Sequence, residues 1–174
     1  MEIEHDEDEL TPLHTANLIL FLAESAKKKI TPMQLNKLTY FSYAWCLHKL
    51  GKKIFNEKIE AWKFGPVIPS LYHEFKRFGS SAIEEHGVSV NYTDVDTIGN
   101  LEIPVLGPEH REIAKVVMSV FEHYKDYSAS QMSNITHKNG SPWSIARAKE
   151  GYNTPLEDAD ILKRCKKLLK NETT

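Results

Sequence analysis

Histidine is the side chain in this sequence best suited to metal binding or acid–base catalysis. A helix offers two ring nitrogens to one metal ion when two histidines lie three or four residues apart. No two of the eight histidines have that spacing; they are His5, His14, His48, His73, His86, His110, His123 and His137. We therefore predict surface or hydrogen-bonded core histidines and no metal site, although the spacing leaves open a site assembled from scattered histidines and acids.

The sequence also lacks the motifs that carry a strong catalytic meaning. It contains no G-x-x-x-x-G-K-[ST], G-x-G-x-x-G, H-E-x-x-H or G-x-S-x-G. Its two cysteines, Cys46 and Cys165, are far apart and form no C-x-x-C pair, which argues against a zinc ribbon or a disulfide framework. Each is expected to serve as a small apolar residue on a helix. We predict a protein that is not an enzyme and needs no cofactor.

Charge and length set further bounds. The 174 residues suit one domain, and a net charge of −2 lacks the basic excess of a strong nucleic-acid binder. Residues 1–10 hold six acids and no Lys or Arg, which predicts a disordered acidic tail before a single domain over residues 11–170. An alternative is that this tail shields a basic partner surface. The acidic start is unlike a signal peptide, and the longest apolar run, residues 18–23, is too short to span a bilayer, so we expect a cytoplasmic protein without a membrane partner.

Three helix starts are legible in the sequence. Residues 31–34 (Thr-Pro-Met-Gln), 154–157 (Thr-Pro-Leu-Glu) and 128–131 (Ser-Ala-Ser-Gln) each place a hydroxyl residue three positions before Gln or Glu. In such a capping box the hydroxyl accepts from a free N–H of the first turn, and the Gln or Glu reaches back to the cap N–H. Proline at the first helical position costs nothing, because its missing N–H would be unpaired there.

The remaining pattern predicts a mainly α protein. Helices are expected over residues 12–28, 32–50, 69–78 and 108–125, with Gly51 and Gly79 just past two of the ends. Residues 88–92 and 101–105 instead alternate apolar and polar residues with period two, as half-buried strands do, and Pro104 would need an unpaired edge. The expected fold is a compact helical single domain with a small β-ribbon between its two helical halves. One helix is marked by an apolar stripe of Ile113, Val116, Val117, Val120, Phe121 and Tyr124.

Residues 128–149 look like a helix-turn-helix. A short helix, a turn at Asn139-Gly140 and a second helix bearing Arg147 and Lys149 follow one another, which suggests a DNA-binding regulator as an alternative function. The second helix opens with Pro142-Trp143, and this favours two packed helices with Trp143 as an anchor.

The most distinctive run is residues 60–75, E-A-W-K-F-G-P-V-I-P-S-L-Y-H-E-F. It follows L-N-K-L-T-Y-F at residues 35–41 and G-K-K-I-F at residues 51–55, and a later segment, residues 130–143, ends in T-H-K-N-G-S-P-W. In this order the motifs resemble the Panacea antitoxin domain, which also occurs in SocA-type proteolytic adaptors and phage-associated GepA-type proteins. The resemblance covers roughly residues 12–150. Asn36 departs from it, since glutamine is expected before the lysine.

The resemblance implies a mainly helical fold and a protein-binding role. Panacea-type proteins are implied to neutralise a cognate toxin by direct binding, and SocA-type members to deliver a toxin to a Clp-type protease. Neither role needs a catalytic residue. A homodimer is only the default oligomeric expectation.

Stiffness and aromatic content point to a candidate partner-binding surface in the distinctive run. Pro66 fixes its own φ and is expected to bias Gly65 toward an extended conformation, so that the turn forms a rigid, exposed corner. Trp and Tyr are frequent interface anchors, although core packing is the competing interpretation for Trp62, and Tyr72 could instead pin its helix to the core. The predicted partner-binding residues are Trp62, Lys63, Phe64, Gly65, Pro66 and Tyr72.

Overall fold

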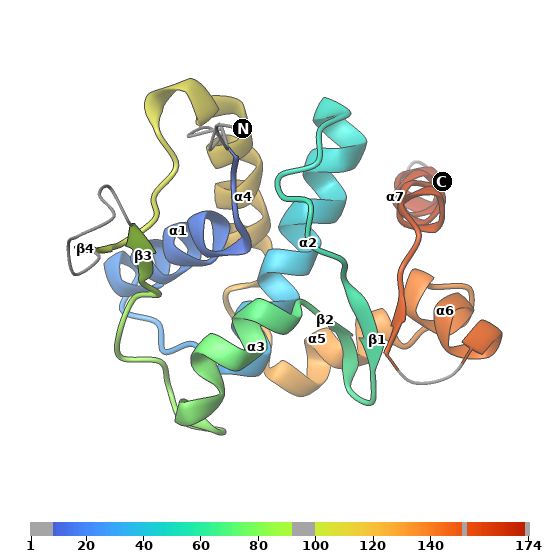
Figure 1. Ribbon diagram of the computed structural model, residues 1–174. Helices are drawn as coiled ribbons and strands as arrows, with labels where there is room; N and C mark the ends of the chain where they lie inside the picture. Colours follow the sequence, from blue (N-terminus) through green and yellow to red (C-terminus); the bar gives the residue numbers. More distant parts are fainter. Residues whose placement is uncertain (1–8, 92–99, 151–152, 173–174) are drawn as a thin grey trace, which may run out of the picture.

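Helix α2 (Pro32–Leu50) runs through the middle of the protein in the computed structural model, which describes residues 9–91, 100–150 and 153–172. Helices α1 (Pro12–Ser25), α4 (Arg111–Tyr124) and α7 (Asp158–Glu172) pack directly against it (Figure 1). Because these neighbours surround it, α2 buries residues on every side instead of along one stripe. The predicted mainly α fold is confirmed.

The ends of α2 follow from local sequence. The Thr31 hydroxyl accepts from the backbone N–H of Gln34 at 3.3 Å, and the Gln34 side-chain oxygen accepts from the backbone N–H of Thr31 at 3.0 Å. Gly51 ends the helix with a φ of 65°, a left-handed conformation that glycine adopts without a Cβ clash. Another capping box begins α5 (Ala129–Thr136) at Ser128 and Gln131, again as predicted.

The other helices cover this centre. The stripe predicted for α4 is buried at Ile113, Val116, Val117, Val120 and Phe121, and α3 (Pro69–Phe75) continues as a short 3-10 turn (Lys76–Phe78) to Gly79. Another 3-10 turn (Pro108–His110) precedes α4, and α6 (Pro142–Glu150) follows α5. No helix in the described part of the chain is both long and apolar enough to cross a bilayer.

Two small antiparallel sheets flank the helices. In the first, β1 (Glu60–Trp62) lies between β2 (Gly65–Val67) and β5 (Thr154–Pro155). The second pairs β3 (Ser89–Asn91) with β4 (Asn100–Glu102), and it confirms the predicted ribbon. Pro104 lies beyond the end of β4, so it blocks no hydrogen bond of the ladder.

The helix start predicted at residues 154–157 is wrong. Thr154 and Pro155 pair with β1, where the backbone N–H of Leu156 donates to the carbonyl of Ile59 at 2.8 Å. A helix over these residues would give up that pairing, so α7 begins only at Asp158. The predicted acidic tail, residues 1–10, lies outside the described residues except for its last two, and the single domain over residues 11–170 stays a prediction.

The cysteines take the roles expected of small apolar residues. Cys46 on α2 and Cys165 on α7 are both buried and free. Burial raises the pKa of Cys46 to about 12 and that of Cys165 to about 11. Both thiols therefore stay protonated at neutral pH, and the reactive thiolate is scarce.

Truncating the central helix tests this packing. Leu38→Ala on α2 removes a side chain that is buried among the core residues, and it should lower the free energy of unfolding by about 2–5 kcal/mol in urea titrations. Met118→Ala on α4 is the matched control, because Met118 is 49% exposed, and it should change stability by less than about 0.5 kcal/mol. Equal effects of the two variants would contradict the position assigned to α2.

Candidate functional site

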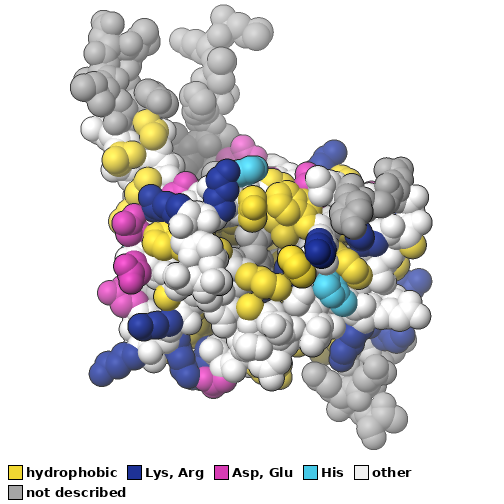
Figure 2. All heavy atoms as spheres, turned by 90° about the horizontal axis from the view of Figure 1, so that it is seen from below, with side chains coloured by type: hydrophobic (Ala, Val, Ile, Leu, Met, Phe, Trp, Pro, Cys, Tyr) yellow, Lys and Arg dark blue, Asp and Glu magenta, His cyan; other side chains and the backbone are white. Residues whose placement is uncertain are grey.

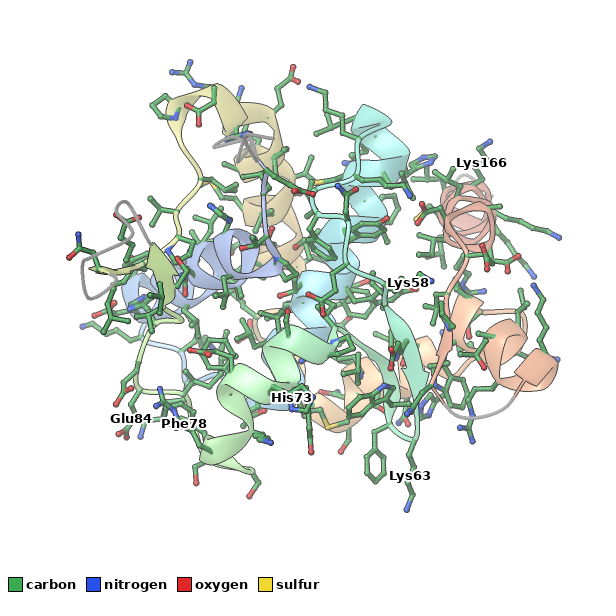
Figure 3. The ribbon with its side chains drawn as sticks, in the orientation of Figure 1. Lys58, Lys63, His73, Phe78, Glu84 and Lys166 are labelled. Atoms are coloured by element: carbon green, nitrogen blue, oxygen red, sulfur yellow. The ribbon has the colours of Figure 1, made fainter. Side chains whose placement is uncertain are left out.

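A two-residue turn forms the tip of the β1–β2 hairpin. Trp62 pairs with Gly65 across the strands, which leaves Lys63 and Phe64 as the connecting residues, here called the hairpin tip. Lys63 points away from the body of the protein in Figure 3. Phe64 is 58% exposed, and the Lys63 Nζ atom lies 5.2 Å from the centre of its ring. The tip therefore presents an aromatic ring and a cation to solvent side by side.

Side chains from three helices hold the backbone of this hairpin. Lys37 Nζ on α2 donates to the carbonyl of Pro66 at 3.0 Å, and Ser133 Oγ on α5 donates to the carbonyl of Phe64 at 2.8 Å. The indole N–H of Trp143 on α6 donates to the carbonyl of Trp62 at 2.7 Å. Three separate helices thus fix the position of the hairpin.

One further bond closes the same cradle. The side-chain oxygen of Asn36 on α2 accepts from the backbone N–H of Ile68 at 2.7 Å, and both residues are buried. Asn36 is the position at which the sequence departs from the glutamine of the resembling motif. In this chain the asparagine at that position is one of the side chains that hold the backbone beside the hairpin.

Lys37 is the unusual member of the cradle. Lys37 is only 1% exposed. Among the described residues, no carboxylate forms a salt bridge with it. Burial lowers the pKa of Lys37 to about 7, because the low-dielectric interior disfavours the charged ammonium. The hydrogen bond to Pro66 is therefore made by a group that is partly neutral at physiological pH.

Gly65 makes this close approach possible. Its φ is +110°, and a Cβ atom there would lie 2.6 Å from Thr136 Oγ1 and 2.9 Å from Lys37 Cε. The extended conformation expected for Gly65 is thus wrong, because the tight hairpin and the adjacent lysine require a backbone that side chains disfavour. Gly65 and Pro66 are buried, so only the tip of the predicted corner is exposed.

Residues 128–149, the segment that resembles a helix-turn-helix, pack against the hairpin through Ser133 and Trp143. The hydroxyl of Ser141 donates to the carbonyl of Thr136 at 2.7 Å across the α5–α6 junction. His137 lies against the Trp143 ring with centroids 4.0 Å apart, and burial, followed by the positive charges of Lys37 and Arg147, lowers the pKa of His137. The two helices of this segment pack together with Trp143 as an anchor, which is the interpretation that the sequence favoured over a DNA-binding motif.

The six predicted residues divide into a buried and an exposed group. Trp62 is partly buried, and its indole N–H donates to Glu60 Oε2 at 2.7 Å. Tyr72 on α3 is 40% exposed and meets Trp62 edge-on, with centroids 4.8 Å apart. Lys63, Phe64 and Tyr72 form the outer surface, and hydrophobic side chains gather near the middle of this face in Figure 2.

Sequence reasoning missed the residues that hold the hairpin. Asn36, Lys37 and Ser133 lie within the distinctive motifs, but their types suggest solvent-exposed positions. The only signal in the sequence was context, because most of the residues around Asn36 and Lys37 in their helix are apolar or aromatic. Three of the four motifs meet in the cradle: residues 35–41 and 130–143 supply its side chains, and residues 60–75 supply the hairpin that they hold.

Comparison with known proteins agrees with this arrangement. The family model for the SocA-like antitoxin with a Panacea domain matches residues 35–144, a span that contains the hairpin and all four side chains of the cradle. This chain belongs to the SocA-like Panacea family. It is 31% identical over 156 residues to Antitoxin SocA of Caulobacter vibrioides, an alignment that covers 90% of this chain and 78% of that protein. No solved structure gives a significant match.

The buried lysine predicts a specific dependence of stability on pH. Between pH 7 and the ordinary lysine pKa of 10.5, the unfolded chain keeps a proton on Lys37 that the folded chain has released. The contribution of Lys37 to the free energy of unfolding should therefore rise through that window. Wild type should gain a few kcal/mol relative to Lys37→Met between pH 7 and 10 in urea titrations, whereas a difference that is constant with pH would contradict a depressed lysine pKa.

The close approach at Gly65 can be separated from backbone strain alone. Gly140→Ala introduces a Cβ at a φ of +73° with nothing within 4 Å, so it should cost only the strain of about 1–2 kcal/mol. Gly65→Ala adds collisions with Lys37 and Thr136, and thermal unfolding should show a clearly larger loss. Equal losses would mean that the lysine and the hairpin are not tightly packed.

Proposed function

We propose that this chain is an antitoxin that neutralises a cognate toxin by binding it directly, with Lys63, Phe64, Tyr72 and the exposed edge of Trp62 as its docking surface. Membership of an antitoxin family supports a toxin partner and a binding role in place of catalysis. The observation that carries the choice of surface is the exposed Phe64 ring on a hairpin whose backbone is held by Lys37, Ser133 and Trp143.

Rigid presentation is the physical argument for docking at the tip. Burying an exposed aromatic side chain favours association, and a backbone that is already fixed loses little conformational entropy on binding. Trp, Tyr and Arg dominate the energetics of most interfaces, and Trp62 and Tyr72 already form one edge-on pair beside the tip. The expected counterpart on the toxin is an apolar pocket with an acidic rim that faces Lys63.

Masking and delivery share this first step. A toxin held at the hairpin tip is neutralised if its own active surface is covered. It is removed if the complex then brings it to a Clp-type protease, the second role that family resemblance suggests. The amount of toxin that persists in cells after antitoxin expression separates the two outcomes, since only delivery shortens the lifetime of the toxin.

The tip is tested by replacing its exposed side chains. Phe64→Ala combined with Lys63→Glu should abolish protection of cells that express the cognate toxin. It should also weaken binding by at least about 30-fold in calorimetry, the loss expected of an interface hot spot. Both residues are exposed and their side chains take no part in the cradle, so the variant should unfold at the wild-type temperature.

Met118→Ala is the matched control, an exposed apolar residue on α4, which lies away from the hairpin in Figure 1. Unchanged protection by the tip variant at equal expression would mean that the toxin binds elsewhere. Salt-dependent binding of wild type to duplex DNA that is lost with Arg147→Ala and Lys149→Ala would instead favour the DNA-binding alternative.

A further inference from the structure

The amino group of Lys37 has a single hydrogen-bond acceptor. Its Nζ atom donates to the carbonyl of Pro66 at 3.0 Å, and the described part of the chain offers it no other hydrogen-bond partner. An ammonium brings three donors, one more than the neutral amine, and a buried donor without an acceptor is costly. A proton added to Lys37 therefore leaves a further N–H without a partner, at a residue that is 1% exposed.

The charges around Lys37 do not compensate that proton. Burial, and after it the positive charges of Lys37 and Arg147, lowers the pKa of His137, so a proton on either His137 or Lys37 repels the other. Strand β2 bears no titratable side chain, and none of the described carboxylates forms a salt bridge with Lys37. Helix α3 also packs against α2, and its titratable side chains are Tyr72, His73 and Glu74.

The hairpin covers the amino group of Lys37 closely. A Cβ atom at Gly65 would lie 3.0 Å from Nζ, so the backbone of β2 passes directly over the lysine. Strands β1 and β2 have only three residues each, and β2 is at the edge of its sheet among the described strands (Figure 1). Short elements at the surface open at a lower free-energy cost than core helices do, and an opened hairpin would admit water to Lys37.

Proton binding favours the open hairpin. Burial lowers the pKa of Lys37 to about 7 in the closed hairpin, whereas a hydrated lysine keeps its ordinary value of 10.5. Between these two values the open hairpin holds a proton that the closed hairpin has released, so a rise in pH favours closure. Below pH 7 both arrangements are protonated at Lys37, and the effect levels off.

We propose that the β1–β2 hairpin opens locally from α2 and that Lys37 takes up a proton as it opens, so that protons regulate the docking surface at the hairpin tip. The closed hairpin presents Phe64 and Lys63 on a fixed backbone, and the open hairpin does not. As regulation of toxin binding this inference rests on the proposed function. The opening itself is a property of this chain alone and can be measured without the toxin.

Hydrogen exchange of the full chain measures the opening. The probes are the amide N–H of Ile68, which donates to Asn36, and the indole N–H of Trp143, which donates to the carbonyl of Trp62. Both should exchange faster than buried α2 amides such as that of Phe41, at rates that low concentrations of urea leave unchanged, as local opening requires. After correction for intrinsic exchange, their opening constants should fall at least about tenfold from pH 7 to pH 9.

Two variants assign the proton. Lys37→Met should make the opening constants of both probes nearly independent of pH in this range. His137→Gln is the matched control, because it removes the neighbouring titratable ring, and it should keep the pH dependence of wild type. The Lys37 Cε resonance of wild type should itself titrate below pH 9, a measurement that needs no variant if Lys37→Met fails to fold.

The outcomes separate this opening from the choice of docking surface. Exchange of both probes only together with the α2 amides would overturn the proposal. So would opening that does not change with pH, a pH dependence that survives Lys37→Met, or a Lys37 that stays charged at pH 9. Phe64→Ala with Lys63→Glu should keep the wild-type pH dependence, so a toxin that binds elsewhere would refute the docking surface without altering the exchange result.

Discussion

The hydrogen bond from the buried Lys37 Nζ to the carbonyl of Pro66 is the contact on which the candidate site depends. A lysine enclosed by a helix bundle is costly unless its donor is used and its charge is reduced, and here burial lowers its pKa to about 7. The bond in turn requires a glycine at position 65, because a Cβ there would collide with the lysine. These contacts fix the position of Phe64 at the tip, although β1 and β2 have only three residues each.

The same arrangement recurs at the ribbon. Asn17 holds Gly87 and Pro104 as Lys37 holds Pro66. In both places the glycine leaves no room for a Cβ, which would collide with Lys37 and Thr136 at Gly65 and with Leu13 at Gly87. In each case these hydrogen bonds hold a short antiparallel pair of strands, and apolar side chains of that pair or its turn are exposed. The hairpin and the ribbon lie on different sides of the protein (Figure 1).

The sequence predicts the parts of this fold that local interactions decide. The caps at Thr31 and Ser128 and the stripe on α4 involve residues within a few positions of one another, and all three are confirmed. The helix start at Thr154 had the same local pattern, but that prediction was wrong. Thr154 pairs instead with Ala61, a residue so distant in the sequence that no local pattern could indicate the pairing. Strands of two or three residues, such as β5 and β2, are too short to show a period.

The sequence indicated the exposed residues of the candidate site but not the buried side chains that hold the hairpin in place. Phe64 and Lys63 could be singled out from their types and their neighbouring proline, whereas the role of Lys37 depends on which helices enclose it, a tertiary fact that a lysine in a sequence does not reveal. The division of the corner into buried Gly65 and Pro66 and an exposed tip likewise depends on that enclosure.

The most direct test of the central claim is site-specific photocrosslinking in the toxin complex. A benzoylphenylalanine residue placed at position 64 should crosslink to the toxin, while the same residue at position 118 on α4 should not, because the proposed docking surface includes the hairpin tip and leaves out α4. Crosslinking at position 118 without any at position 64, in complexes that still neutralise the toxin, would contradict a docking surface built on the Lys37-held hairpin.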